Sequence, residues 1–363
     1  MFYEKSFLSY LLVGLLALFS FNALVAKSLF KGKEDIEKVP LVYESGYNIG
    51  CLGIEKLHPF DTGKYGKVFE SLKRLGIKAG QFHKPGEASY KDLELVHTKR
   101  YLESLKNSAQ VARVAELPFL QVVPNWLLQW AVLTPMRKAT AGTALAAKLA
   151  LENGRAAVNI GGGYHHAKKH EGGGFCFFAD IPYAAEKLWQ ENPNLKIVVV
   201  DLDAHQGNGH EDYFKYDERV TVFDLYGEKI YPYGRDGTRK YITYNHPVKL
   251  YIEDGEYLQI LENNLGKAMD ESNPDIIFYN AGTDILKGDP VGGFNVSKEG
   301  IIKRDEMVFD FAKRNKVPVC MVTSGGYTSE SARVISDSLE NLGKKGYIPG
   351  LKNYLPRSVA EYL

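Results

Sequence analysis

Residues 197–205 read Ile-Val-Val-Val-Asp-Leu-Asp-Ala-His, and this segment is the most informative of the chain. A short β-branched run such as Ile197–Val200 is typical of a buried strand in a parallel sheet. Polar side chains then follow at the C-terminal end of that strand, where open α/β sheets hold their ligands. Asp203 and His205 point the same way on a continuing strand and suit a divalent ion such as zinc. The alternative is an acidic strand end beside an ordinary core histidine.

The segment Gly161–His166 follows a second strand pattern, at Ala156–Ile160, and reads Gly-Gly-Gly-Tyr-His-His. Glycine lets the backbone turn sharply and leaves room for a ligand. The strand and the glycines therefore favour fixed positions for His165 and His166 over two surface histidines in a flexible loop.

Two further strand patterns each end in small residues and one functional side chain. Pro274–Phe278 leads to Asp284 through Tyr-Asn-Ala-Gly-Thr, and Pro318–Val322 leads to Tyr327 through Thr-Ser-Gly-Gly. Asp284 can be the third ligand of a zinc ion, which leaves one position open for water, as a catalytic site requires. Tyr327 can donate its phenol hydrogen to a developing oxyanion. The alternatives are a helix-capping aspartate and an ordinary aromatic anchor.

From Leu41 on, short apolar runs alternate with amphipathic helix patterns. This order predicts an α/β fold in which helices cover both faces of a parallel sheet. Strands are predicted at 156–160, 197–201, 220–225, 275–279 and 317–323, and helices at 64–75, 141–153, 181–190, 254–269, 297–315 and 329–341.

Composition narrows the functional classes. The chain has 363 residues, of which 45% are hydrophobic and 25% charged, as in ordinary globular domains. Its net charge is +1, so no direct binding to nucleic acid is expected. The cysteines, Cys51, Cys176 and Cys320, have neither the number nor the spacing of a disulfide framework or of a cysteine-ligated zinc site.

Taken together, these motifs resemble those of the histone deacetylase family, in the family's order and from about Val39 to about Leu342. Details such as Leu57–Asp61 and Asp203–His210 resemble class IV, the histone deacetylase 11 type. The resemblance implies the arginase/deacetylase fold, an open and largely parallel sheet of about eight strands with helices on both faces. The matching segments are the paired histidines of 161–166, the channel motif Gly-Gly-Phe-Cys-Phe-Phe-Ala-Asp at 173–180, and residues 201–209, 281–284 and 324–327.

The resemblance implies zinc-dependent hydrolysis of acyl groups from lysine side chains, with one zinc ion held by Asp203, His205 and Asp284. A zinc ion polarises the substrate carbonyl and makes bound water more acidic. Tyr327 is expected to donate to the oxyanion that forms. The resemblance also implies a potassium ion near Asp201, Asp203 and His205.

By the same resemblance, Asp201 pairs with His165 and Asn208 pairs with His166. Many deacetylases have an aspartate where this chain has Asn208. An aspartate partner favours imidazolium, whereas an asparagine gives no such charge support. We therefore predict that His166 stays neutral near pH 7 and acts as the general base.

The substrate channel is expected to have aromatic walls, Phe175 and Tyr231, with Gly174 leaving room for the lysine stem. Gly325 and Gly326 are expected below the zinc ion. The partner is then an acylated lysine on a protein or peptide. The resemblance to class IV also implies removal of long fatty acyl groups.

Residues 118–135 are rich in proline, tryptophan and leucine, and their prolines exclude a single helix. Trp126 and Trp130 are spaced by four residues and can share a helix face. Two interpretations stay open here. One is a core helix that ends in a loop, and the other is an apolar rim near the channel that contacts acyl groups or a membrane.

The stretch Phe7–Ala26 has 20 residues without a charge, enough to span a bilayer. We expect residues 1–38 to be a membrane anchor or signal peptide with a linker, and residues 39–363 to be the deacetylase catalytic domain. The lysines that follow the stretch weakly place that domain in the cytoplasm, with residues 7–26 in the membrane. A cleaved signal peptide would instead make the protein secreted.

Other functions remain open. An acetylpolyamine amidohydrolase would need an acidic gatekeeper at the channel mouth, for which Glu228 is the candidate. A two-manganese ureohydrolase shares the fold but needs further carboxylates, and the chain has Asn208 where one would help. A catalytically inactive acyl-lysine-binding protein is disfavoured by the intact set of catalytic residues, and a membrane scaffold rests on Phe7–Ala26 alone.

Overall fold

A computed structural model describes residues 37–50, 61 and 63–354 of the chain. The predictions for Phe7–Ala26 and Cys51, and most of the motif Leu57–Asp61, lie outside these described residues. The division between residues 38 and 39 stays a prediction.

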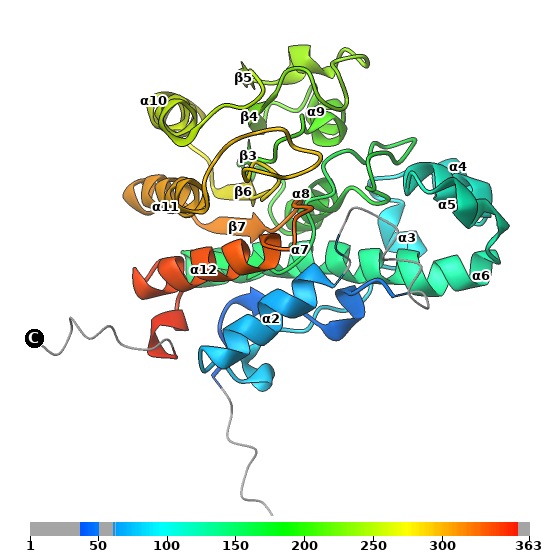
Figure 1. Ribbon diagram of the computed structural model, residues 1–363, viewed down its shortest axis with the longest axis horizontal. Helices are drawn as coiled ribbons and strands as arrows, with labels where there is room; N and C mark the ends of the chain where they lie inside the picture. Colours follow the sequence, from blue (N-terminus) through cyan, green and yellow to red (C-terminus); the bar gives the residue numbers. More distant parts are fainter. Residues whose placement is uncertain (1–36, 51–60, 62, 355–363) are drawn as a thin grey trace, which may run out of the picture. The chain divides into compact units, whose positions relative to one another are not determined.

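A parallel sheet in the order β1-β2-β7-β6-β3-β4-β5 forms the centre of the described chain (Figure 1). The fold prediction is confirmed, although the described residues contain seven strands where about eight were expected. All five strands predicted individually are present, and the edge strands β1 and β5 are additional. The strands are β1 (Leu41–Val42), β2 (Ala156–Asn159), β3 (Ile197–Asp201), β4 (Val220–Gly227), β5 (Tyr244–Val248), β6 (Ile276–Asn280) and β7 (Val319–Val322).

The register of the strands brings the four motif segments to one edge of the sheet. Asp201 at the end of β3 lies level with Asn280 at the end of β6. Val322 at the end of β7 is level with both Asn280 and Asn159 of β2. Because all these strands are parallel, the segments that follow them leave the sheet at the same edge, which is where α/β sheets bind ligands.

Helices cover both faces of the sheet, as predicted. The longer ones include α7 and α8 against one face and α10, α11 and α12 against the other (Figure 1). The helices are α2 (Lys64–Arg74), α3 (Tyr90–Leu93), α4 (Lys99–Ser104), α5 (Ser108–Val114), α6 (Asn125–Leu128), α7 (Thr134–Asn153), α8 (Asp180–Glu191), α9 (Asn208–Phe214), α10 (Asp254–Ser272), α11 (Lys298–Asn315) and α12 (Ser331–Lys344).

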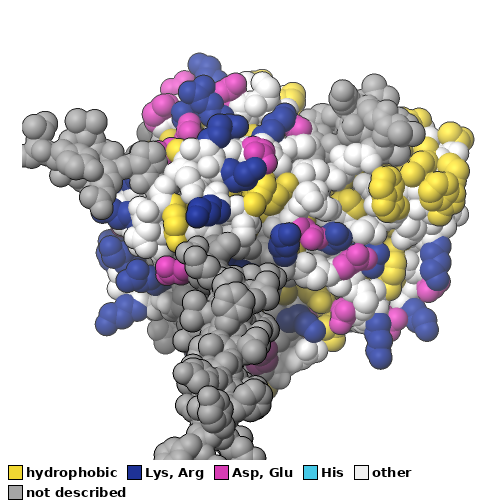
Figure 2. Space-filling model, turned by 90° about the horizontal axis from the view of Figure 1, so that it is seen from below, with side chains coloured by type: hydrophobic (Ala, Val, Ile, Leu, Met, Phe, Trp, Pro, Cys, Tyr) yellow, Lys and Arg dark blue, Asp and Glu magenta, His cyan; other side chains and the backbone are white. Residues whose placement is uncertain are grey.

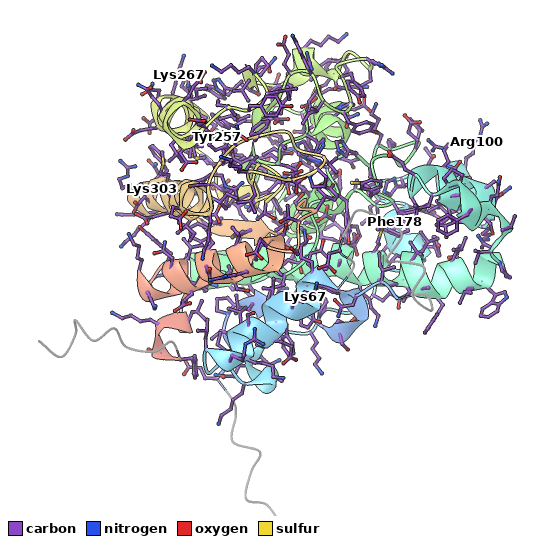
Figure 3. The ribbon with its side chains drawn as sticks, viewed as in Figure 1. Lys67, Arg100, Phe178, Tyr257, Lys267 and Lys303 are labelled. Atoms are coloured by element: carbon purple, nitrogen blue, oxygen red, sulfur yellow. The ribbon has the colours of Figure 1, made fainter. Side chains whose placement is uncertain are left out.

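The alternation of side chains along β3 shows how one apolar run serves two cores. Ile197 and Val199 pack with α7 and α8, whereas Val198 and Val200 pack on the opposite face with α10 and α11. Such a strand is apolar at every position because both of its faces are buried. The covering helices are apolar on one side: Tyr257 of α10 is buried, whereas Lys267 and Lys303 point outward (Figure 3).

The segment 118–135 is broken as its prolines predicted. It forms a 3-10 helix at Pro118–Val122, then α6, and then a π-helical turn at Gln129–Leu133 that leads into α7. The helix α7 begins at Thr134, before the predicted start at residue 141. Pro135 is tolerated there because it lies in the first turn.

The predicted localisation at a membrane has to be corrected. Within residues 37–50, 61 and 63–354, no helix combines the length and the apolar character that crossing a bilayer requires. The apolar stretch that led to the prediction lies outside these residues.

Candidate functional site

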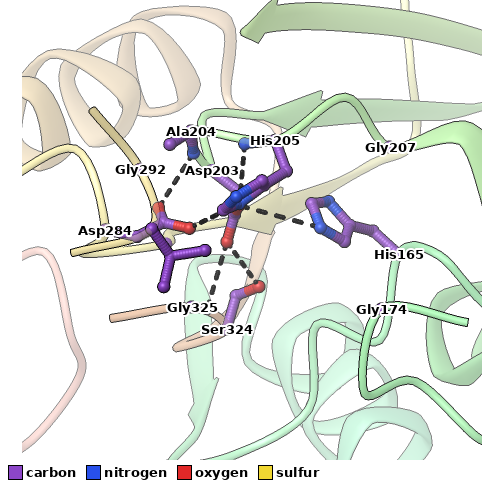
Figure 4. A network of polar contacts seen from close by, with 12 residues as sticks. His165, Gly174, Asp203, Ala204, His205, Gly207, Asp284, Gly292, Ser324 and Gly325 are labelled. Atoms are coloured by element: carbon purple, nitrogen blue, oxygen red, sulfur yellow. Dashed lines mark hydrogen bonds and ion pairs between the residues drawn. The ribbon is translucent and has the colours of Figure 1, made fainter. Parts of the chain in front are cut away.

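Asp203, His205 and Asp284 converge at the common edge of β3 and β6, and all three are buried. Their potential ligand atoms lie within 4.8 Å of one another. The Nδ1 atom of His205 is 2.9 Å from Oδ2 of Asp284 and 3.1 Å from Oδ1 of Asp203. Figure 4 shows the three side chains pointing toward one another. The structure thus brings Asp284 together with two residues that are 79 and 81 positions away from it in the chain.

In each carboxylate of this group, one oxygen accepts hydrogen bonds from residues outside the group, and the other oxygen faces Nδ1 of His205. The Oδ2 atom of Asp203 accepts hydrogen bonds from Ser324 Oγ and Gly325 N, at 3.0 and 3.1 Å. The Oδ1 atom of Asp284 accepts one from the backbone N–H of Ala204 at 2.8 Å. The remaining oxygens and the imidazole are a donor set that fits a zinc ion.

The electrostatics of the group also fit a cation. Burial, together with the nearby charge of Asp203, raises the pKa of Asp284 to about 7. Two buried carboxylates at this separation repel each other unless a positive charge lies between them. A Cβ atom added to Gly325 would lie 2.5 Å from carboxylate oxygens of Asp203 and Asp284, so glycine is required where the backbone passes this group.

His165 and His166 lie side by side next to the candidate metal site, with ring centroids 4.0 Å apart. The Nδ1 atom of His165 is 2.8 Å from Oδ2 of Asp201, and Nδ1 of His166 is 2.7 Å from Oδ1 of Asn208. Both pairings are therefore present in the structure. Nε2 of His165 is 3.7 Å from Oδ1 of Asp203, which links the histidine pair to the metal group.

The two histidines differ in charge because their partners differ. Burial alone would lower the pKa of His165, but the charges of Asp201 and Asp203 outweigh it and raise the pKa to about 9. Burial, followed by the charges of His165 and His205, lowers the pKa of His166 well below its ordinary value. A neutral His166 is what its predicted role as general base requires.

Tyr327 faces the same space from the turn after β7. Its ring meets that of Phe175 edge-on at 6.1 Å and that of His205 at 6.4 Å. Its backbone N–H donates to Oδ2 of Asp289 at 2.8 Å. Burial raises the pKa of Tyr327 well above its ordinary value, so its hydroxyl keeps the proton that it would donate.

The channel residues predicted from the sequence surround these groups. Gly174 and Phe175 line the pocket, and Tyr231 packs edge-on against His166 with centroids 4.7 Å apart. A Cβ atom added to Gly174 would lie 2.4 Å from Cδ2 of His166, which explains the glycine. Gly326, also predicted for the channel, is not among the residues that line the pocket, and its carbonyl is 3.5 Å from Nζ of Lys64.

The pocket continues from the polar group into an apolar part that comes from the segment before α7. Its walls there are Leu117, Leu120, Leu128 and Val132, together with Met136 from the first turn of α7, and Leu128 is fully buried. The outer side of the same segment is apolar as well. Hydrophobic side chains gather on the surface at this end of the molecule (Figure 2), and the exposed ones are Phe119, Val122, Trp126 and Trp130.

Four residues of the site escaped the sequence analysis. Lys64 of α2 is buried and donates to the carbonyls of Ser324 and Gly325 at 2.6 and 2.9 Å. Asp236 accepts a hydrogen bond from Asn208 at 2.6 Å. The other two are His97 and Glu116. All four lie outside the strand ends that signalled the site.

His97 supports the segment that follows the histidine pair. Its Nδ1 atom is 3.0 Å from the carbonyl of Lys168, and its Nε2 atom accepts the backbone N–H of Ala179 at 3.0 Å. Burial lowers the pKa of His97 to about 4.

A second buried group lies behind the histidine pair. It consists of Asp201, His210 and Asp224, whose potential ligand atoms also lie within 4.8 Å of one another. Nε2 of His210 is 3.2 Å from Oδ2 of Asp201.

Comparison with known proteins finds similar chains. Residues 58–341 match the model of a family described as the histone deacetylase domain. The chain is 46% identical over 314 residues to "Histone deacetylase 2" of Arabidopsis thaliana, which covers 86% of this chain and 81% of that protein. It is 28% identical over 285 residues to "Histone deacetylase 1" of Homo sapiens, which covers 75% of this chain and 58% of that protein.

Among solved structures, the crystal structure of the HDA15 HD domain is similar in fold. The TM-score is 0.70 at 21% sequence identity, and the match covers 89% of this chain and 90% of that chain.

Proposed function

The chain belongs to the histone deacetylase domain family, and from this membership we propose that it is a zinc-dependent hydrolase that removes acyl groups from lysine side chains. One observation carries the proposal. Asp203, His205 and Asp284 form a buried group of potential metal ligands, directly beside a histidine pair and a tyrosine that line a pocket.

In this proposal each side chain has one task. Asp203, His205 and Asp284 would hold zinc, which polarises the acyl carbonyl and makes water a better nucleophile. Neutral His166 takes a proton from the attacking water, while Tyr327 donates a hydrogen bond to the carbonyl oxygen as it becomes negative. The carbon–nitrogen bond of the amide then breaks. The lysine amine leaves with the proton that His166 took from the water.

His165 supports this step as a charged neighbour. Its raised pKa keeps it protonated at neutral pH, so it adds positive charge beside the place where the oxyanion forms. The same charge helps to keep His166 neutral. The two adjacent histidines therefore have different protonation states.

The apolar part of the pocket supports a preference for long acyl groups. The walls formed by Leu120, Leu128, Val132 and Met136 offer a surface for methylene groups. Each buried methylene contributes roughly 0.8 kcal/mol to binding. We therefore propose defatty-acylation as an activity beside deacetylation.

Two finer assignments remain proposals. Membership of class IV is supported by Asn208, which pairs with His166 where many deacetylases have an aspartate. A potassium ion near Asp201, Asp203 and His205 is supported by the second buried group, which shares Asp201.

The decisive experiment combines metal content with an acyl series. The protein is loaded with zinc, its metal content is measured, and lysine peptides with acetyl, octanoyl and myristoyl groups are offered as substrates. We expect one zinc per chain and faster turnover of the longer acyl groups. Zinc without hydrolysis of any acyl-lysine peptide would favour a protein that only binds acyl-lysine.

A second candidate, an acetylpolyamine amidohydrolase, is supported by Glu116. This residue follows α5 with φ of 53°, and its carboxylate receives the backbone N–H of the channel residue Gly174. The predicted gatekeeper Glu228 does not line the pocket. Glu116 contacts the lining residue Gly174 and lies between the lining residues Ala115 and Leu117, so it is the acid that would recognise a cationic substrate. Turnover of acetylspermidine above that of acetyl-lysine peptide would establish this function.

A further inference from the structure

A chain of hydrogen bonds leads from the histidine pair to an acid on the loop that follows β4. Nδ1 of His166 is 2.7 Å from Oδ1 of Asn208, and Nδ2 of Asn208 donates to Oδ2 of Asp236 at 2.6 Å. The ammonium group of Lys168 donates to the same Oδ2 at 2.8 Å. Oδ1 of Asp236 accepts from the backbone N–H and the hydroxyl of Thr238, at 3.3 and 3.0 Å. Both oxygens of Asp236 are therefore engaged.

The chemistry of the amide gives this chain a direction. An ionised carboxylate only accepts hydrogen bonds, whereas an amide has a donating and an accepting end. Facing Asp236, Asn208 must present its NH₂ group, because the reverse orientation would place two oxygens against each other. Its oxygen then faces His166, and an oxygen can only accept. The hydrogen of that contact must therefore come from Nδ1 of His166.

The tautomer of a neutral imidazole follows from this constraint. With hydrogen on Nδ1, the lone pair is on Nε2. His166 lines the pocket, and Nδ1 is already committed to Asn208. Nε2 is the nitrogen that remains to take a proton in the pocket.

The carboxylate of Asp236 does not contact His166 directly, because the side chain of Asn208 lies between them. Burial alone would raise the pKa of Asp236, but hydrogen bonds from Asn208 and Lys168 outweigh it and lower the pKa. The carboxylate is thus ionised at neutral pH, and a neutral amide separates it from the imidazole. At His165, in contrast, the carboxylate of Asp201 is a direct partner at 2.8 Å.

From this geometry we propose that Asp236 is a positioning residue for proton transfer, which orients the amide of Asn208 and thereby fixes His166 in the tautomer with its lone pair on Nε2. The inference rests on the proposed deacylase function, because it assigns the proton-accepting atom of that reaction. Asp236 thus determines which ring nitrogen of His166 carries the hydrogen. Because Asn208 lies between them, Asp236 does not favour the imidazolium form as a directly bonded carboxylate would.

The first test reads the tautomer without using turnover. The full chain is loaded with zinc and labelled with ¹⁵N in its histidines, and the two ring nitrogens of His166 are observed by NMR near pH 7, with a His166→Gln variant for assignment. We expect hydrogen on Nδ1 in the wild type. In Asp236→Asn the amide of Asn208 can turn, and we expect a mixture of the two tautomers. Hydrogen on Nε2 in the wild type would overturn the proposal.

The second test separates kcat from KM. We expect Asp236→Asn to lower kcat about 10- to 100-fold, the range typical of residues that orient a catalytic group, with KM little changed. Asp236→Glu keeps a carboxylate and should recover part of the loss. The matched control is Asp212→Asn. Asp212 lies on α9, the helix that carries Asn208, and the substitution removes its surface ion pair with Lys215. The control should match the wild type.

The outcomes distinguish this proposal from the proposed function. If the tautomer changes as expected but neither protein hydrolyses acyl-lysine, the positioning role stands and the deacylase function fails. If the wild type is an active deacylase and folded Asp236→Asn keeps both its kcat and its Nδ1–H tautomer, the positioning role is wrong. A melting curve of each variant shows whether it is folded.

Discussion

The floor of the pocket and its apolar rim differ in how much each side chain depends on its neighbours. We define the floor as Asp203, His165 and His166, which line the pocket, together with His205 and Asp284, which form the candidate metal site with Asp203. All five are buried and held by partners from other segments. The rim is the segment 118–133, which carries apolar side chains on both its inner and its outer side. Buried polar groups need specific partners, whereas apolar side chains need only the removal of water. Substitutions should therefore cost much more activity at the floor than at the rim.

The largest effect is expected at the floor, from Asp203→Asn. The substitution keeps the shape of the side chain but removes the charge that would hold the metal. Zinc stabilises the transition state by several kcal/mol, so we expect activity to fall on the order of 10³-fold, with loss of bound zinc. Metal analysis and deacylation rates measure both, and Asp212→Asn is the surface control. An active variant with full zinc content would remove Asp203 from the proposed ligands.

Tyr327→Phe should have the next largest effect and should spare the metal. Loss of one donor to an oxyanion typically costs about 10²- to 10³-fold in kcat. Zinc content and KM should stay near those of the wild type, because the phenyl ring keeps its packing against Phe175. A variant with unchanged kcat would show that the tyrosine is an aromatic anchor, the alternative that the sequence left open.

Much of the floor could be predicted from the sequence because its residues follow strand patterns. Parallel strands end at one edge of the sheet, so the segments after β3, β6 and β7 had to meet there. Lys64 could not be found in this way. In sequence it is one lysine at the start of a helix, a pattern typical of a solvated face. Its buried position depends on the carbonyl of Ser324, 260 residues away.

The orientation of the rim could not be predicted either. A spacing of four residues places Trp126 and Trp130 on one side of a helix, but does not say whether that side is buried. In the structure they are 71% and 66% exposed. Leucines on the other side of the segment occupy the buried positions. The π-helical turn at Gln129–Leu133 also changes the helical register between the two tryptophans. The two tryptophans therefore lie outside the core, whereas Leu128 and Leu133 of the same segment are part of it.

On the inner side of the rim, Leu128→Ala should affect stability and substrate preference together. Leu128 is fully buried and lines the apolar part of the pocket. Truncation of such a leucine typically lowers the free energy of unfolding by about 2–5 kcal/mol. We also expect kcat/KM for a myristoyl-lysine peptide to fall more than for an acetyl-lysine peptide. Equal losses for both substrates would place the acyl chain elsewhere.

His97, which belongs to neither the floor nor the rim, should make the stability of the protein sensitive to acid. Its two ring nitrogens are satisfied only in the neutral form, because Nε2 accepts the N–H of Ala179. Its folded pKa of about 4 is below the unfolded value near 6.5, so the unfolded chain binds the proton first. Above pH 6.5 this histidine does not lower the free energy of unfolding. As the pH falls from 6.5 to about 4, its protonation in the unfolded chain lowers the free energy of unfolding by up to about 3 kcal/mol. Denaturant unfolding across this range should show a flatter pH dependence for His97→Gln, and identical slopes would contradict the assignment.

The smallest effect is expected on the outer side of the rim, from Trp126→Ser and Trp130→Ser. Both side chains are mostly exposed, so their removal creates no cavity and leaves no polar group without a partner. Surface substitutions of this kind usually change the free energy of unfolding by less than about 0.5 kcal/mol. Melting curves and turnover of acetyl-lysine peptide should match the wild type, in contrast to Leu128→Ala two positions after Trp126. If Trp130→Ser were as costly as Leu128→Ala, the outward orientation of this segment would be wrong. The apolar wall of the pocket would then have to be assigned to other residues.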